Sequence, residues 1–124
     1  MGNDISKHTK QFVIQKHSKA GDTHWDFMLE TEGVLATWRL EFPPETLPQI
    51  CKAEKIFDHD TRFLTYEGPV NKGKGTVKIA ENGTYEIVRK EENEMQIKMT
   101  GTILKEVFTL KKAGENIWHL IRQQ

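Results

Sequence analysis

A two-residue alternation of apolar and polar side chains runs along most of this chain, and it is clearest over residues 24–30. One set of alternate positions there is mostly polar and the other is apolar: His24, Asp26, Met28 and Glu30 against Trp25, Phe27 and Leu29. This period is typical of a β-strand with one apolar face, because successive side chains point to opposite sides. Similar runs predict about eight to ten short strands, over residues 11–17, 24–30, 34–41, 55–57, 62–67, 76–79, 84–90, 95–99, 103–110 and 117–122.

Turn residues divide these runs and indicate how they connect. Pro43, Pro44 and Pro48 interrupt strand formation, so residues 45–52 are expected to form a short helix or an irregular crossing. Asn82-Gly83 is typical of a two-residue type I′ hairpin. The Gly-Lys-Gly at 73–75 favours a tight turn or bulge over a phosphate loop, because it opens no helix.

The number and spacing of the strands predict the fold class. We expect an all-β protein with minor α content, folded as a small closed or nearly closed antiparallel β-barrel. Residues 1–10 are polar, carry His8, and are expected to be a flexible N-terminal tail. Residues 11–124 are then a single domain, in which Trp25, Trp38 and Trp118 belong to the core.

Composition narrows the classes of function. The 124 residues include 18 basic and 18 acidic side chains, so the net charge is zero. This balance argues against extensive coating of duplex nucleic acid, yet it permits recognition of a single strand end. The lone cysteine, Cys51, excludes an internal disulfide and is expected to be an inert thiol in a reducing compartment. Without a long apolar run or a hydrophobic signal segment, we expect a soluble, cytoplasmic monomer that binds no membrane.

Three side chains in one stretch suggest a metal site. His24 and Asp26 share a strand face about 7 Å apart, and the loop 18–23 can fold His17 back beside His24. Two imidazoles and a carboxylate suit Mn²⁺, Fe²⁺ or Zn²⁺, with further positions left for water and substrate. We expect the ion inside the mouth of the barrel. The alternative is a polar strand face with surface hydrogen bonds and no ion.

Several segments resemble one known family. FVIQKH, HWDFMLE and GVLATW, in that order, are similar to the opening of the 3′-phosphoesterase domain of bacterial and archaeal DNA ligase D. The likeness continues into further short pieces and covers about residues 11–122. These pieces are Asp58-His59, Tyr66-Glu67-Gly68, Gly75-Thr76-Val77 and Trp118-His119-Leu120-Ile121.

The resemblance implies an enzyme that trims 3′-phosphate or 3′-ribonucleotide ends of DNA or a primer-template in DNA repair. It implies that His17, His24 and Asp26 bind Mn²⁺, with Zn²⁺ or Co²⁺ as alternatives, and that His59 contacts the reacting phosphate. The implied partners are DNA or RNA–DNA 3′ ends, with ligase or polymerase repair proteins acting in trans.

Two positions depart from the family pattern. Met28 and Phe63 stand where the family has an arginine and a tyrosine that contact phosphate. Methionine offers no hydrogen-bond donor, so another cation must act or the activity must be weakened. Arg62 is the first candidate replacement. Weaker candidates are Lys16, Lys19, Arg39 and Lys55 for the cation, Tyr66 for the hydroxyl, and Glu30 and Glu32 as carboxylates orienting a ligand histidine.

Three hypotheses follow. The first is a metal-dependent 3′-phosphoesterase with His59 and Arg62 acting on phosphate. The second is a catalytically weakened module of the same fold that binds nucleic-acid ends. The third is a hydrolase of small phosphate esters or cyclic phosphates on a similar barrel.

Overall fold

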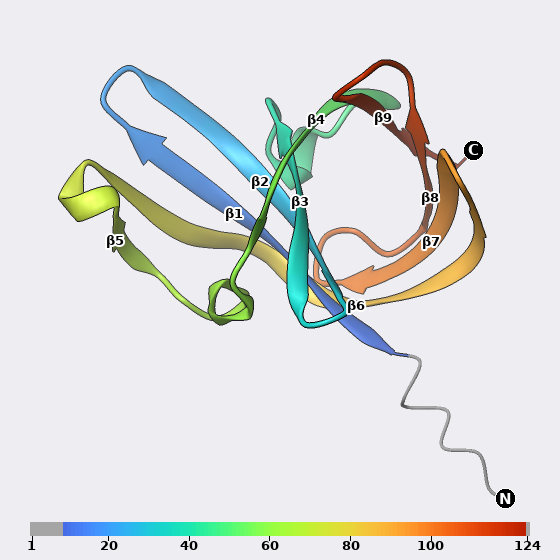
Figure 1. Ribbon diagram of the computed structural model, residues 1–124, viewed down its shortest axis with the longest axis horizontal. Helices are drawn as coiled ribbons and strands as arrows, with labels where there is room; N and C mark the ends of the chain where they lie inside the picture. Colours follow the sequence, from blue (N-terminus) through green and yellow to red (C-terminus); the bar gives the residue numbers. More distant parts are fainter. Residues whose placement is uncertain (1–8, 124) are drawn as a thin grey trace, which may run out of the picture.

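A computed structural model describes residues 9–123 and confirms the all-β prediction (Figure 1). The nine strands are β1 (Lys10–Lys19), β2 (Asp22–Thr31), β3 (Val34–Leu40), β4 (Ile50–His59), β5 (Gly68–Val70), β6 (Gly75–Glu91), β7 (Glu94–Gly101), β8 (Val107–Lys112) and β9 (Ile117–Arg122). Three short 3₁₀-helices lie between strands: η2 (Pro44–Thr46), η3 (Thr61–Leu64) and η4 (Asn71–Gly73). None of the helices in this described part of the chain is long and apolar enough to cross a membrane.

The strands close into an antiparallel barrel, as expected. Their order is β1-β2-β3-β4-β9-β8-β7-β6, and the pairing of β6 with β1 completes the ring. The short strand β5 pairs with β6 beside the ring. In Figure 1 the β1–β2 hairpin, the first half of β6 and β5 extend to one side of the ring, so this region has a second face that the barrel does not enclose.

The barrel interior holds the main hydrophobic core. Phe12, Ile14, Phe27 and Leu29 are buried there, together with residues of every other barrel strand. Trp38 is buried within this core, and Trp25 and Trp118 are partly buried against it, which confirms the expectation for the three tryptophans. Cys51 is also buried in it, and burial raises the pKa of its thiol to about 11. A buried thiol with a raised pKa is a poor nucleophile.

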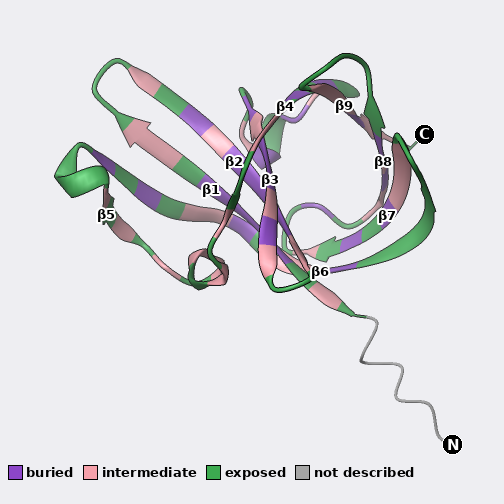
Figure 2. Ribbon diagram, in the orientation of Figure 1, coloured by how far each residue is buried: buried purple, intermediate pink, exposed green. Residues whose placement is uncertain are grey.

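The outer face of β1, β2 and β3 carries a second, smaller cluster. Val13, Met28 and Leu35 are fully buried in it, and Phe63 and Leu64 of η3 pack over them. Four consecutive residues are buried in each of β1 and β2, at 12–15 and 26–29, and Figure 2 shows buried and partly buried positions along these strands. The β1–β2–β3 sheet is therefore covered on both faces, and η3 supplies the outer cover.

The predicted hairpin at Asn82-Gly83 is wrong. Residues 75–91 form one long strand that pairs with β1 over its first part and with β7 over its second. Neither residue has the positive φ that a type I′ turn requires. Gly83 is needed for close approach instead, because a Cβ there would lie 2.1 Å from the Thr100 carbonyl oxygen.

Three further boundaries differ from the sequence prediction. Residues 62–67 were expected to be extended, but most of them lie in η3 and the turn after it. The region 45–52 contains η2 and then enters β4 at Ile50. The first strand begins at Lys10, and the expected tail, with His8, lies largely outside the described residues.

The expected strand 103–110 begins only at Val107, and Glu81 explains why. This buried carboxylate accepts hydrogen bonds from the backbone amides of Thr102, Ile103 and Leu104, at 3.1, 2.7 and 2.7 Å. Its own neighbour, Asn82, donates a fourth at 3.0 Å. The amides of residues 102–104 therefore point at a side chain and leave the strand ladder.

Replacing this carboxylate tests its structural role. Hydrogen bonds to a charged group contribute about 1.5–3 kcal/mol each, and unpaired buried amides are costly. We expect Glu81→Ala to lower the free energy of unfolding by about 3 kcal/mol or more, measured by urea denaturation. Glu86→Ala, at an exposed position on the same strand, is the control and should change it little. Equal stability of the two variants would contradict this role.

Candidate metal centre

The β1–β2 hairpin brings the predicted ligands together. The two-residue turn at Ala20-Gly21 joins the strands, and Gly21 adopts a φ of 74°. The register places His17 directly opposite His24, and Gln15 opposite Asp26. The sequence prediction that His17 folds back beside His24 is therefore confirmed, although strand pairing rather than a loop does it.

The location within the barrel was predicted wrongly. Trp25 and Phe27 face the interior core. His24 and Asp26 alternate with them, so they share the outer face with Met28. The donors consequently lie outside the barrel mouth, on a face that the segments around η3 and η4 cover.

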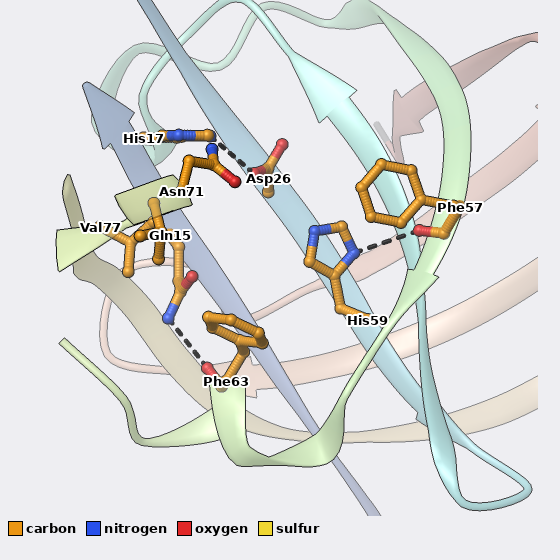
Figure 3. Close-up of a pocket in the computed structure, with 9 residues that line it drawn as sticks. Gln15, His17, Asp26, Phe57, His59, Phe63, Asn71 and Val77 are labelled. Carbon is orange, nitrogen blue, oxygen red and sulfur yellow. Dashed lines mark hydrogen bonds and ion pairs between the residues drawn. The ribbon is translucent and has the colours of Figure 1, made fainter. Parts of the chain in front are cut away.

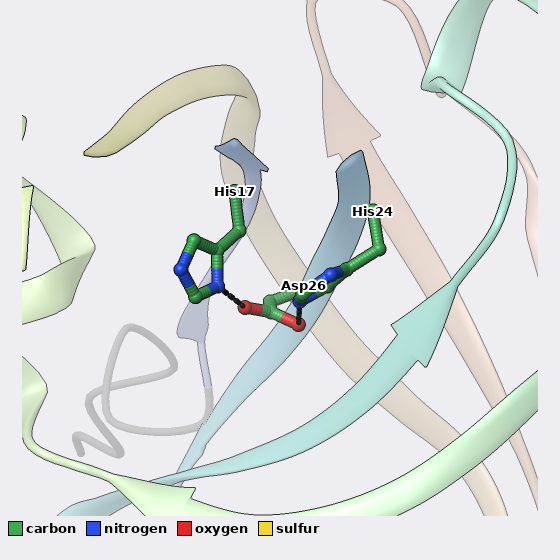
Figure 4. A group of neighbouring side chains, drawn as sticks. All are labelled: His17, His24 and Asp26. Atoms are coloured by element: carbon green, nitrogen blue, oxygen red, sulfur yellow. Dashed lines mark ion pairs between the residues drawn. The ribbon is translucent and has the colours of Figure 1, made fainter. Parts of the chain in front are cut away.

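The three side chains converge closely (Figure 4). His17 Nδ1 lies 3.7 Å from one oxygen of the Asp26 carboxylate, and His24 Nε2 lies 3.2 Å from the other. One donor atom from each residue falls within 4.8 Å of the others. His24 and Asp26 are buried, with 6% and 3% of their surface exposed, and His17 is half-buried.

The electrostatics of this cluster suit a cation. A buried carboxylate needs a positive partner, yet Asp26 Oδ1 has no hydrogen-bond donor among residues 9–123. Burial lowers the pKa of His17, against the opposing effect of Asp26, so its neutral form is favoured. Neutral imidazole is the form that ligates metals. The donor set therefore fits a divalent ion.

Gly75 of β6 sets the orientation of the His17 ring. A Cβ at this position would lie 3.0 Å from His17 Nε2, so the imidazole packs against the glycine backbone. This contact leaves Nδ1 of His17 facing Asp26. Gly75, the second glycine of the Gly-Lys-Gly stretch, thus leaves room for the imidazole of His17, one of the predicted metal ligands.

Asp22 and Arg39 form an ion pair next to His24. Asp22 Oδ2 lies 3.6 Å from His24 Nδ1, and Arg39 Nη2 donates to Asp22 Oδ1 at 3.2 Å. A carboxylate on the second ring nitrogen commonly orients a metal-binding histidine. The sequence prediction had placed Glu30 or Glu32 in this role, whereas the Glu30 carboxylate accepts from the Gln11 amide at 3.0 Å.

His59 reaches the same region from β4 through a β-bulge. Thr37 pairs with Ile56 and Leu35 with His59, so β4 has one extra residue here. Bulges re-aim side chains and are common beside functional sites. His59 Nδ1 lies 2.9 Å from the Thr37 hydroxyl and 3.1 Å from the Phe57 carbonyl oxygen.

These contacts assign the tautomer of His59. The Thr37 hydroxyl donates to the Leu35 carbonyl at 2.9 Å, so its oxygen is left to accept from the ring. The Phe57 carbonyl also only accepts. Nδ1 therefore carries the proton, and Nε2 is the ring nitrogen available to a ligand.

A cavity of about 180 Å³ connects these groups (Figure 3). His17, Asp26 and His59 line it, and an adjoining cavity adds His24 and Arg39. The other residues of the first cavity are Gln15, Phe57, Phe63, Val70, Asn71 and Val77. The predicted metal ligands and His59 thus face one shared space.

Gln15 and Asn71 line this cavity and were not singled out from the sequence. The buried Gln15 amide donates to the carbonyls of Phe63 and Tyr66, at 2.9 and 2.8 Å, and so ties η3 to the sheet. Asn71 begins η4 with a φ of 53°, a left-handed conformation that asparagine tolerates better than most residues. Only the position of Gln15 two residues before His17 hinted at a role.

Arg62 is not brought to the ligands. It is exposed on η3, where its guanidinium stacks over the rings of Phe63 and Tyr66, 5.0 and 5.7 Å from their centroids. It lines neither cavity, whereas Arg39 lines the second. The Tyr66 hydroxyl donates to the Pro69 carbonyl, so it does not replace the missing tyrosine hydroxyl.

The other candidate cations do not face either cavity. Lys55 is occupied by Asp58, 3.6 Å away, and by the Ile56 carbonyl. Lys16 and Lys19 are exposed on β1 and line neither cavity. Of these candidate cations, Arg39 alone lines a cavity together with His17, His24 and Asp26.

Metal binding should appear as thermal stabilisation. An ion at one hundred times its Kd stabilises the folded state by about 2.7 kcal/mol. We expect MnCl₂ to raise the Tm of the wild type by several degrees and to leave Asp26→Asn unchanged. Asp58→Asn, an exposed aspartate outside both cavities, is the matched control and should respond as the wild type does. An equal rise in Asp26→Asn would place the ion elsewhere.

Comparison with known proteins assigns the chain to a family independently of the geometry of the site. The family model described as the DNA ligase D 3′-phosphoesterase domain matches residues 15–112. The "Multifunctional non-homologous end joining DNA repair protein LigD" of Mycobacterium tuberculosis is 37% identical over 82 residues, which cover 60% of this chain and 10% of the relative.

Two further relatives are similar over matches of about the same length. The "Multifunctional non-homologous end joining protein LigD" is 32% identical over 83 residues in Mycolicibacterium smegmatis and 29% identical over 79 residues in Pseudomonas aeruginosa. These matches cover 61% and 60% of this chain, and 10% and 9% of the relatives. The chain therefore corresponds to about a tenth of the length of the proteins it matches. The family match spans His17, His24, Asp26, His59 and most of the barrel, and the chain belongs to the DNA ligase D 3′-phosphoesterase domain family.

Proposed function

We propose that the protein is a metal-dependent 3′-phosphoesterase that removes phosphate or ribonucleotides from 3′ ends of DNA during end-joining repair. One observation carries this proposal: His17, His24, Asp26 and His59 all line the second cavity, and the Nε2 of His59 is free to contact a ligand. The names of the LigD relatives support a role in repair, since each describes non-homologous end joining.

The metal would be held by His17, His24 and Asp26, whose donor atoms already converge. Mn²⁺ is the proposed ion, with Zn²⁺ or Co²⁺ as alternatives. When bound, such an ion supplies charge neutralisation on a phosphoryl oxygen and a more acidic water. Asp22 orients His24 for this task, and Arg39 holds Asp22 in place.

His59 would act on the phosphate itself. Its Nδ1–H is held by Thr37 and the Phe57 carbonyl, so Nε2 can accept a proton from an attacking water. In its charged form the ring can instead donate to a phosphoryl oxygen or to the leaving oxygen. The apolar side chains of Phe63 and Val77 line the cavity and limit the access of water to the reacting group.

A strand end is the proposed substrate. The cavity is small, and the chain has no net charge with which to coat a duplex. A single terminal phosphate requires only local donors, which His59, Asn71 and Arg39 supply around the cavities.

Activity on a defined primer-template tests the proposal. With Mn²⁺, we expect the wild type to convert a 3′-phosphate end to a 3′-hydroxyl end, read on a sequencing gel. His24→Ala and His59→Ala should each lose about 100-fold or more, because one removes a ligand and the other the acid–base group. Asp58→Asn is the control. Absence of product, or a wild-type rate no higher than that of His24→Ala, would refute the hydrolase.

A weakened end-binding module is the second candidate, and Met28 and Phe63 favour it. Met28 is buried in the apolar cluster of the outer face, and Phe63 packs against that cluster while lining the cavity, so two phosphate donors of the family pattern are absent together. In that case the protein would bind phosphate-ended strands in a metal-dependent manner without turnover. Equal affinity for phosphate-ended and hydroxyl-ended strands would argue against end recognition.

The variant Phe63→Tyr, which restores the hydroxyl of the family tyrosine, distinguishes the phosphoesterase from the end-binding module. Phe63 lines the cavity, so Phe63→Tyr places a phenolic donor beside the reacting phosphate. We expect the phosphatase rate to rise about tenfold, a change worth about 1.4 kcal/mol of transition-state stabilisation. Phe42→Tyr adds a hydroxyl outside both cavities and serves as the control. No gain in Phe63→Tyr would mean that this position no longer contributes to catalysis.

A further inference from the structure

Phe57 presents an aromatic ring to solvent at the edge of the candidate site. It is 73% exposed, the highest value among the large exposed hydrophobic residues in the described part of the chain. A single exposed apolar side chain is ordinary by itself. This one, however, lines both cavities and lies beside the histidine proposed to act on phosphate (Figure 3).

The ring is held in a defined position. It stacks on the His59 imidazole with a centroid distance of 4.7 Å and an interplanar angle of 10°. The Phe57 carbonyl accepts from His59 Nδ1, and the bulge in β4 places both residues. The ring of Phe63 makes a T-shaped contact with His59, with ring centroids 5.8 Å apart. Because Phe57 remains 73% exposed despite this stack, the ring face that points away from His59 is available to a ligand.

Building on the proposed function, we propose that Phe57 is the stacking platform for the terminal base of the DNA 3′ end. Every nucleobase has an aromatic face, and exposed aromatic side chains that stack on bases are a common mode of single-strand recognition. The base and the 3′ phosphate of one nucleotide are separated by one sugar. A base on Phe57 therefore leaves that phosphate beside His59 and the metal cluster.

This role would select nucleotides over small phosphate esters. An ester without a base would contact His59 and the metal cluster yet gain nothing from the exposed ring. It would also make end recognition tolerant of base identity, because stacking reads no hydrogen-bond pattern. The platform thus defines a substrate class that the metal cluster alone does not distinguish.

A double-mutant cycle between protein ring and DNA base tests the platform. The strands carry either a normal terminal nucleotide or a tetrahydrofuran abasic residue at the 3′ end. Affinity is measured by fluorescence anisotropy on 3′-hydroxyl strands, which cannot turn over, and kcat/KM on 3′-phosphate strands. The proteins are wild type, Phe57→Leu, Phe57→Trp and the control Val88→Ala, an exposed apolar position on β6.

Removal of the base should cost the wild type about tenfold in affinity. In Phe57→Leu the same removal should cost less than about twofold, because the stacking partner is already absent. Phe57→Trp should restore the penalty, and Val88→Ala should match the wild type. Equal penalties in wild type and Phe57→Leu would overturn the proposal. So would a dimer seen by sedimentation that Phe57→Leu converts to monomers, since the ring would then belong to a protein interface.

The two proposals fail in different ways. If no strand is hydrolysed but the coupling between ring and base persists in the anisotropy data, the hydrolase is refuted and the platform remains. If hydrolysis proceeds but the coupling is absent, the platform is refuted and the hydrolase remains.

Discussion

The burial of the Asp26 carboxylate between two imidazoles is the interaction on which the candidate site depends. A carboxylate that is 3% exposed is unfavourable unless a positive partner lies close to it. The antiparallel register of β1 and β2 places His17 opposite His24, Gly75 packs against the His17 ring, and the Asp22 carboxylate lies 3.6 Å from His24 Nδ1. The cluster is thus assembled by backbone pairing, which positions it more rigidly than a loop would.

The same hairpin must satisfy two hydrophobic clusters at once. Phe12, Ile14, Phe27 and Leu29 fill the barrel, while Val13 and Met28 lie under η3 on the outer face. This explains why the departures from the family pattern at positions 28 and 63 belong together. Met28 is fully buried and Phe63 packs in the same cluster, so an arginine at position 28 would place its charged group among apolar neighbours. Met28 and Phe63 are thus both apolar residues of one cluster on the outer face of the sheet.

Irregular pairing between strands positions Phe57, His59 and Glu81. The bulge in β4 brings Phe57 and His59 to the cavity, and the Thr37 hydroxyl holds the ring of His59. A second irregularity, where Ile14 pairs with Glu81 and Gln15 with Ile79, positions Glu81 to hold the loop after β7. Both features depend on register between distant segments. The alternation of apolar and polar residues along one strand does not reveal an extra residue in the strand that pairs with it. Neither irregularity was therefore predicted from the sequence.

The alternation of side chains was sufficient to predict an antiparallel barrel and to place His24 and Asp26 on one strand face, because both properties follow from a local period of two. The short motifs were sufficient for the family, which the match over residues 15–112 confirms. Only the tertiary structure decided that this face lies outside the barrel, that Arg39 rather than Arg62 lies near the ligands, and that Gly83 serves strand approach rather than a turn. These outcomes depend on which segments pack together across long separations, and such contacts leave no local signature in a single sequence.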